Sequence, residues 1–505
     1  MTRIVLIFIA LAAAFPIAAG GESPGDQIVT TRRQIKVGQR ALRYTARAGR
    51  LPIRHNETGE IHGHMFFVAY LLDRLPSEPA RPLTFLWNGG PGSNSTLVHL
   101  SGFGPKRIKS NDDQNDRGDG APDCECELED NQSTWLDQTD LVFVDPIGAG
   151  FSRPTRAEYA AEFYNTLGDI ASVTEFVRVY LTRFDAWDAP LFIGGESYGV
   201  WRAAGVAEAL AQRRRKVAGV ILISGGIPVG PALSDEMRTA LFVPTRTAAA
   251  FFHKKLPPEL QTDLGSALEK AERWARAEYA PALAKRDKLS EPERQNILAQ
   301  LARFTGIDAS LIDAKTLVLA RQQFAEQLLR DRKQALARFD TRQIVGSETP
   351  ARAERANLIN EYLRSTLRFK TDLAYQGIEE GFSPSAGWRT LSVGARWNYN
   401  QGPPPPPGAP LNTDAPPGGS QPWLRRAIAL DPSIKAFVAA GLYDSLNSCA
   451  GNAYLVSQLE PELKRNITAA CYEGGHMMYE SRDARRRLKQ DVSGFMLETL
   501  AGRSK

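Results

Sequence analysis

The stretch at residues 190–199, Pro-Leu-Phe-Ile-Gly-Gly-Glu-Ser-Tyr-Gly, constrains the fold of this chain more than any other. Its apolar first half predicts a buried strand, and residues 200–211 after it predict a helix. The chain must bend sharply between them, and the glycines two residues before and after Ser197 remove side chains that would clash in so tight a bend. Ser197 is therefore expected at the tip of a strained turn.

Strands, glycine-rich turns and helices alternate along the first half of the chain. Residues 34–72 contain alternating segments that predict antiparallel strands at one edge of a sheet. Apolar runs at 82–87, 140–145 and 220–224 predict buried strands, as a mostly parallel sheet requires. Together with the serine turn, this pattern predicts the α/β class and an α/β-hydrolase fold.

Composition changes divide the chain into five expected segments. Charged, alanine- and leucine-rich residues after 230 predict amphipathic helices, and the return of strand patterns at 435–441 and 467–471 favours a helical insertion over a separate helical domain. The expected segments are a signal peptide at 1–20, a first part of the hydrolase core at 21–230, a helical cap at 231–374, an irregular, Pro-rich linker at 375–425 and a second part of the core at 426–505.

The first twenty residues have a charged start at Arg3, an apolar middle and a small-residue end, which predicts a secretory signal. The protein is therefore expected to be exported, either to a periplasm or fully secreted. A retained anchor is the alternative, but the apolar run is shorter than the roughly 20 residues that a spanning helix needs. No stable membrane association is expected once the signal is removed.

The charge and the histidines exclude other classes of function. The net charge of +5 is small for 505 residues, and the basic clusters at 213–216 and 485–487 fall on expected helices as solvated faces, so no nucleic-acid partner is expected. His62 and His64 lie on one expected strand, where an ordinary edge face is favoured over a metal pair. No metal or other cofactor is predicted.

A serine nucleophile needs a base and an acid that orients the base, and in this fold they follow the serine in the order acid, histidine. Two histidines follow Ser197. His253 lies beside two lysines in a solvated context of the expected cap, whereas His476 follows the last strand in a glycine-rich loop and is assigned as the base. Asp444 closes the preceding strand and is assigned as the acid; Asp145 also ends a strand but precedes the serine.

Four cysteines in an exported chain are expected to pair. Three connectivities are possible, and pairing of Cys449 with Cys471 is the first choice because that bridge would brace both partners of Ser197. Cys124 and Cys126 are too close for a relaxed bridge with each other and are candidates for a reactive or metal-binding pair.

The chain resembles the serine carboxypeptidases in four motifs. They are Trp-Asn-Gly-Gly-Pro-Gly at 87–92, Asp-Pro-Ile-Gly-Ala-Gly-Phe-Ser at 145–152, Gly-Glu-Ser-Tyr-Gly at 195–199 and Gly-Gly-His-Met at 474–477. They occur in the family's order and over most of the mature chain. The resemblance implies removal of single residues from the carboxyl end of peptides through an acyl-enzyme, with Ser197, Asp444 and His476 as catalytic residues.

The same resemblance implies an oxyanion hole formed by the backbone N–H groups of Gly90 and Tyr198. It also implies that Asn88, Gly89 and Glu196 hold the terminal carboxylate of the substrate. A carboxyl group pairs with a carboxylate only when one of them holds a proton, so binding is expected to favour acidic pH. In the alternative interpretation, Glu196 only stabilises the turn and does not bind the substrate.

The chain departs from the family in three places. Gly102 stands where the family commonly has a second acidic residue, Ser93 stands where many members have cysteine, and residues 477–480 lack the usual proline. The predicted function is therefore an exported serine carboxypeptidase acting on peptides, with an esterase or acyltransferase using the same residues as the alternative. A non-enzymatic scaffold is disfavoured because the full catalytic set is present.

Overall fold

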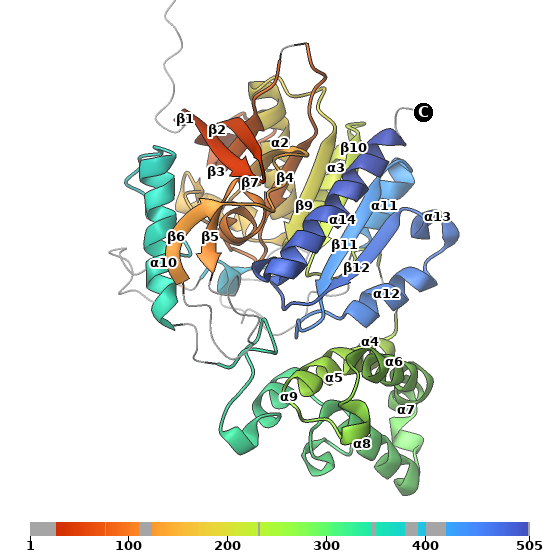
Figure 1. The fold of residues 1–505 in the computed structure, drawn as a ribbon. Coiled ribbons are helices and arrows are strands. Elements are labelled where there is room, and N and C mark those ends of the chain that lie inside the picture. Colours follow the sequence, from red (N-terminus) through yellow and green to blue (C-terminus); the bar gives the residue numbers. More distant parts are fainter. Residues whose placement is uncertain are drawn as a thin grey trace, which may run out of the picture.

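The strands of the main sheet lie in the order β1-β2-β3-β7-β4-β9-β10-β11-β12 in the computed structural model (Figure 1). The structure describes residues 27–75, 77–110, 124–230, 233–345, 349–378, 392–399 and 421–502. The strands are β1 (Ile28–Val37), β2 (Arg40–Arg54), β3 (Ile61–Leu72), β7 (Asp140–Val144), β4 (Leu83–Trp87), β9 (Leu191–Glu196), β10 (Val217–Ile223), β11 (Lys435–Gly441) and β12 (Ile467–Tyr472), with β8 (Arg153–Pro154) paired to β3.

The direction of the strands changes along the sheet. Strands β1, β2, β3 and β7 pair antiparallel, and every pair from β7 across to β12 is parallel. This confirms the predicted α/β-hydrolase fold with antiparallel N-terminal edge strands. Because the parallel strands share one direction, the residues that follow β4, β9, β10, β11 and β12 all meet at one edge of the sheet.

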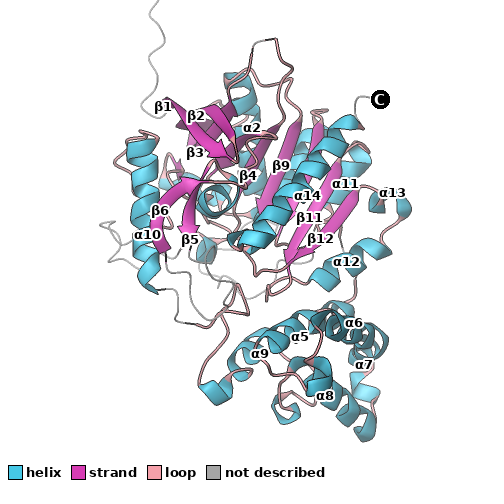
Figure 2. Ribbon diagram, viewed as in Figure 1, coloured by secondary structure: helices cyan, strands magenta, loops and turns pink. Residues whose placement is uncertain are grey.

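Helices cover both faces of this sheet (Figure 2). The helices of the core are α1 (Ala160–Phe163), α2 (Thr166–Arg183), α3 (Gly199–Gln212), α10 (Thr349–Glu361), α11 (Trp423–Leu430), α12 (Cys449–Gln458), α13 (Pro461–Lys464) and α14 (Arg482–Ala501). Helices α2, α3 and α11 bury apolar side chains on one face, and α14 and the π-helical turn η1 (Leu97–Phe103) bury theirs on the other. A separate hairpin of β5 (Lys106–Ser110) and β6 (Cys124–Asp130) lies beside α10.

A group of helices follows β10 and lies beyond the sheet edge that carries the strand ends (Figure 1). They are α4 (Asp235–Ala240), α5 (Val243–Phe252), α6 (Leu264–Trp274), α7 (Ala280–Ala284), α8 (Glu291–Thr305) and α9 (Arg321–Gln327). They share an apolar core of their own, whereas Ile359 and Tyr362 from the α10 region pack with the sheet. The boundaries of the cap at 231 and 374 stay predictions.

Two predictions lie largely outside the described residues. The signal peptide at 1–20 lies wholly outside them, and of the linker at 375–425 only 375–378, 392–399 and 421–425 are described. Within the described ranges, no helix has the length and apolar character needed to cross a membrane.

Candidate functional site

The turn that carries Ser197 joins the end of β9 to the start of α3. Ser197 has a φ of 58°, a left-handed conformation that non-glycine residues rarely adopt. Its N–H donates to the carbonyl of Ile223 on the neighbouring strand at 2.8 Å. A Cβ atom on Gly195 would lie 2.0 Å from the carbonyl oxygen of Gly199. The glycine at this position therefore permits the bend, as the sequence predicted.

Asp444 and His476 lie in the loops after β11 and β12 and contact each other directly. Nδ1 of His476 lies 2.8 Å from Oδ2 of Asp444, and the two residues are 2% and 0% exposed. Asp444 also accepts hydrogen bonds from the Leu446 N–H at 2.8 Å and the Asn447 side-chain amide at 2.9 Å. This carboxylate can hold the imidazole with its proton on Nδ1, which leaves Nε2 as the proton acceptor.

Ser224 and Asn447 support this pair and were missed by sequence reasoning. The Ser224 hydroxyl donates to the backbone carbonyl of His476, and its N–H donates to Ala439 on β11 at 2.8 Å. The Asn447 amide donates to the Ser224 carbonyl at 2.8 Å as well as to Asp444. The position of Ser224 at the end of the strand predicted at 220–224 was the available sequence signal.

Glu196 faces the other nitrogen of the imidazole. Its Oε1 lies 3.2 Å from Nε2 of His476, and Nε2 makes no hydrogen bond within the described part of the chain, to Ser197 or to any other residue. Burial raises the pKa of Glu196, although the His476 charge and the Asn88 hydrogen bond oppose this. Burial lowers the pKa of His476, but the hydrogen bond to Asp444 and the charge of Glu196 outweigh burial, so the net shift is upward.

Asn88 and Gly89 follow β4 and lie against the serine turn. The Asn88 side-chain amide donates to Oε2 of Glu196 at 2.7 Å, and its side-chain oxygen accepts from the Val98 N–H at 3.1 Å. A Cβ atom on Gly89 would lie only 2.5 Å from the backbone nitrogen of Tyr198. Any side chain at position 89 would therefore push these two segments apart.

The N–H groups predicted for the oxyanion hole lie in these same two segments. Neither Gly90 nor Tyr198 donates its backbone N–H to another residue in the described ranges. Gly90 has a φ of 101°, which favours glycine. Two unsatisfied donors beside a nucleophile turn are what an oxyanion hole requires.

A buried ion pair between Arg202 and Asp169 contacts the backbone of Asn88. Nε of Arg202 on α3 donates to Oδ2 of Asp169 on α2 at 2.8 Å, and its Nη1 donates to the Asn88 carbonyl at 2.9 Å. The two side chains are 0% and 2% exposed. A buried charge is costly without its partner, so Arg202 is held against Asp169. Its hydrogen bond to the Asn88 carbonyl then fixes the position of the Asn88 backbone.

Two of the departures from the family pattern lie in contact. A Cβ atom on Gly102 would lie 3.4 Å from the ring of Tyr479, in the segment that lacks the usual proline. Tyr479 is fully buried, and its hydroxyl lies near the Asn88 side chain without a well-formed hydrogen bond among the described residues. Burial first, and then the charge of Glu196, raise the pKa of Tyr479 well above its usual value. Tyr479 is thus a neutral phenol, and it lies beside Gly102, where the family commonly has a second acidic side chain.

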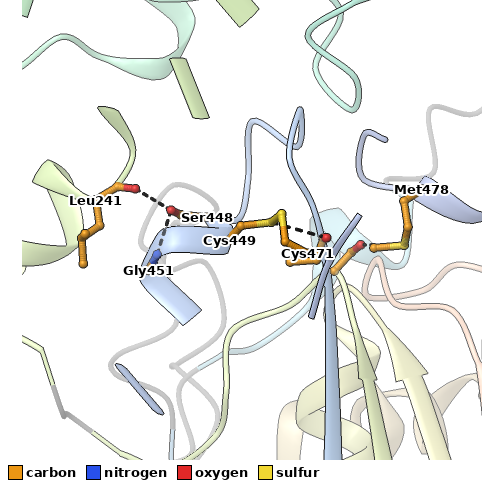
Figure 3. The surroundings of a disulfide bond; sticks show 8 residues. Leu241, Ser448, Cys449, Gly451, Cys471 and Met478 are labelled. Atoms are coloured by element: carbon orange, nitrogen blue, oxygen red, sulfur yellow. Dashed lines mark hydrogen bonds between the residues drawn. A yellow bond between two sulfur atoms is a disulfide. The ribbon is translucent and has the colours of Figure 1, made fainter. Parts of the chain in front are cut away.

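The predicted disulfide between Cys449 and Cys471 is present, with the two Cα atoms 5.6 Å apart (Figure 3). It joins the start of α12 to β12, and so ties the loop after Asp444 to the strand before His476. Ser448 beside it donates a hydrogen bond to the carbonyl of Leu241 in the cap, which connects cap and core (Figure 3). The side chains of Cys124 and Cys126 lie outside the described residues.

Three surface assignments need correction. His253 is only 7% exposed, and its ring hydrogen-bonds the Thr341 carbonyl at 2.8 Å in place of water, so its predicted solvated context is wrong. Arg485 is 5% exposed and donates to the Tyr479 carbonyl at 3.0 Å, so the solvated face predicted at 485–487 is wrong at this position. His62 is 8% exposed and pairs with Glu162 at 2.8 Å rather than lying on an open edge face.

Comparison with known proteins identifies relatives of this chain. The family model described as serine carboxypeptidase matches residues 44–345, which is more than half of the chain. The pheromone-processing carboxypeptidase kex1 of Neurospora crassa is 26% identical over 268 residues, covering 50% of this chain and 35% of that protein. The KEX1 protein of Podospora anserina is 29% identical over 168 residues, covering 32% of this chain and 25% of that protein. The matches thus span about a third or less of these relatives.

A solved structure has the same fold over nearly the whole chain. The crystal structure of Kex1(delta)p, a prohormone-processing carboxypeptidase from Saccharomyces cerevisiae, superposes with a TM-score of 0.52. It is 16% identical in sequence, and the match covers 90% of this chain and 91% of that one.

Proposed function

Because the chain belongs to the serine carboxypeptidase family, we propose that it removes single residues from the carboxyl end of peptides. The observation that carries this proposal is the 2.8 Å contact between Asp444 and His476, at the same sheet edge as the strained turn of Ser197. The family match and the two free N–H groups beside Ser197 support it.

The proposed reaction forms an acyl-enzyme. The Ser197 hydroxyl oxygen attacks the last peptide carbonyl while Nε2 of His476 takes its proton, and Asp444 stabilises the resulting imidazolium. The Gly90 and Tyr198 N–H groups stabilise the negative oxygen of the tetrahedral intermediate. His476 then protonates the leaving amine, and a water molecule hydrolyses the ester in the reverse sequence of proton transfers. For this, the imidazole has to exchange its contact with Glu196 for one with Ser197.

The terminal carboxylate of the substrate is proposed to bind Asn88, the Gly89 N–H and protonated Glu196. The raised pKa of Glu196 supports this role, because the buried carboxyl keeps its proton to a higher pH than an exposed one. The Tyr479 phenol interacts electrostatically with Glu196 and is a neutral donor near the same group. It compensates for the acidic side chain absent at Gly102.

Replacing Glu196 with glutamine is expected to remove the rise of KM with pH for a free-acid peptide. In the wild type, KM for a free-acid peptide should rise about tenfold per pH unit above the pKa of Glu196, because each unit removes nine-tenths of the protonated form. Glutamine stays a neutral donor, so KM of Glu196→Gln should be flat over the same range. The acidic limb of kcat should also move to lower pH, since His476 loses the nearby charge that raises its pKa.

The measurement is a set of Michaelis curves from pH 4 to pH 8 with a free-acid peptide and its C-terminal amide. The amide lacks the carboxylate and serves as the control, because its KM should not follow Glu196. Equal pH dependence of KM in wild type and Glu196→Gln would show that Glu196 only braces the turn.

An esterase or acyltransferase using the same residues is the second candidate, and Gly102 is the observation that favours it. Release of the last residue from blocked dipeptides, compared with their amides and methyl esters, separates the two. Faster cleavage of the free acid supports the carboxypeptidase, and cleavage of esters alone supports the alternative.

Export to a periplasm or to the medium is also proposed. It is supported by the predicted signal at 1–20 and by the Cys449–Cys471 disulfide, since such bonds persist in oxidising compartments. An exported form beginning near residue 21 is expected on N-terminal sequencing, and an intact Met1 would contradict it.

A further inference from the structure

A cavity of about 240 Å³ lies where the cap meets the core. Its lining residues are Phe242, Thr245, Arg246, Arg321, Phe324, Thr341, Ser445 and Leu446, with Arg246 on α5 and Arg321 on α9. Ligand pockets for whole small molecules are commonly about 300 Å³ or larger, so this cavity suits a single side chain.

The two arginines that line the cavity form no ion pair within the described ranges, although the negative charge of Asp444 acts on Arg321. Neither Arg246 nor Arg321 makes an ion pair with any carboxylate in the described ranges, and no acidic side chain lines the cavity. Nη1 of Arg246 is buried and has no hydrogen-bond partner there either. Its guanidinium lies 5.9 Å from the ring centre of Phe324. Burial lowers the pKa of Arg246 to about 10, so it stays protonated at neutral and acidic pH.

A buried guanidinium without a partner is costly, and it becomes favourable when an anion fills the space before it. Arginine also offers donors in a planar fork that matches a carboxylate, with two parallel hydrogen bonds. The cavity is therefore suited to a carboxylate more than to a neutral or cationic group.

The cavity adjoins the candidate catalytic residues. Ser445 and Leu446 directly follow Asp444 in the chain, and the Thr341 hydroxyl donates to the carbonyl of Tyr443 at 2.9 Å. Burial and the charge of Arg338 lower the pKa of Arg321, and the charge of Asp444 opposes them. A peptide bound at the strand ends would thus place a side chain within reach of the cavity.

We propose that this cavity binds the side-chain carboxylate of a glutamate or aspartate near the carboxyl end of the peptide substrate. The two arginines supply the charge, and the cap supplies the walls. This inference rests on the proposed peptidase function and adds its substrate class.

The test compares peptides that differ only in glutamate against glutamine, at the last and at the next-to-last position, at pH 6, where a glutamate side chain is ionised. The wild type is expected to have a kcat/KM at least tenfold higher for glutamate at one of these positions. In Arg246→Gln this preference should fall to about twofold or less, and Arg246→Lys should restore part of it. Arg330→Gln is the matched control, because Arg330 is an exposed cap arginine that does not line the cavity.

Binding is measured separately with Ser197→Ala protein, so that the result does not depend on turnover. Titration calorimetry should give a Kd at least tenfold lower for the glutamate peptide than for its glutamine counterpart. Equal affinity at both positions would overturn the proposal, as would a preference that survives both Arg246→Gln and Arg321→Gln. If Arg246→Gln does not fold, the wild-type preference for glutamate over glutamine and its loss in Arg321→Gln still test the proposal.

The outcomes also separate this inference from the proposed function. Cleavage of the glutamine peptides without discrimination would leave the peptidase function intact and remove only the carboxylate pocket. Tighter binding of the glutamate peptide without any cleavage would keep the pocket and contradict the peptidase.

Discussion

Ser197→Ala is expected to lower kcat for a blocked dipeptide by about a millionfold, the scale at which removing a serine nucleophile abolishes covalent catalysis. KM should change little, because the hydroxyl is small and the carboxylate contacts of Asn88 and Glu196 remain. Single-turnover assays with the purified variant measure the loss, and its circular dichroism and melting temperature should match those of the wild type.

A chemical label provides an independent check on Ser197. A fluorophosphonate probe should attach to Ser197 in the wild type, and mass mapping should find no label on the alanine variant. If Ser197→Ala keeps more than about a hundredth of the wild-type kcat, another residue is the nucleophile and the proposed mechanism is wrong.

Asp444→Asn is expected to lower kcat by about ten thousandfold, with the fold intact. The asparagine keeps the shape but offers an amide N–H or a weaker acceptor to Nδ1 of His476, so the imidazole no longer holds its proton there. The asparagine has a single oxygen, so it can keep the hydrogen bond from Leu446, which donates to Oδ1 of Asp444, but it cannot also keep the one from Asn447, which donates to Oδ2. Rates from pH 5 to pH 9 measure the effect, and part of the activity should return at high pH.

Asp145→Asn is the matched control for this substitution. Asp145 also ends a buried strand, and it accepts hydrogen bonds from the Ser95 N–H and the Tyr375 hydroxyl at 2.8 Å each. It makes no hydrogen bond with His476. Its loss should therefore lower the melting temperature and change kcat little. A larger fall in kcat for Asp145→Asn than for Asp444→Asn would reverse the assignment of the acid.

The fold and the positions of the candidate residues were predictable because their signals are local. The turn at Ser197 depends on glycines within two residues on each side, and the strands on apolar runs of five to seven residues. Parallel strands bring their ends to one edge, so the order of Ser197, Asp444 and His476 in the chain predicted that they lie at that edge.

Burial of polar side chains was less predictable. His253 lies beside Lys254 and Lys255, and the sequence alone favoured a solvated position. Its ring instead hydrogen-bonds the carbonyl of Thr341, 88 residues later. Neighbouring residues in the sequence show only the local charge. Whether a side chain is buried depends on which distant segment packs against it.

The sequence by itself determined the α/β-hydrolase fold and the strained serine turn, because steric limits and hydrophobic periodicity act over a few residues. Only the tertiary structure decided that Ser224 and Asn447 hold the histidine and its acid, that Tyr479 lies beside Gly102, and that Arg246 lines a cavity without an ion-pair partner among the described residues. Each of these depends on contacts between segments far apart in the chain, and no local pattern encodes which side chains meet there.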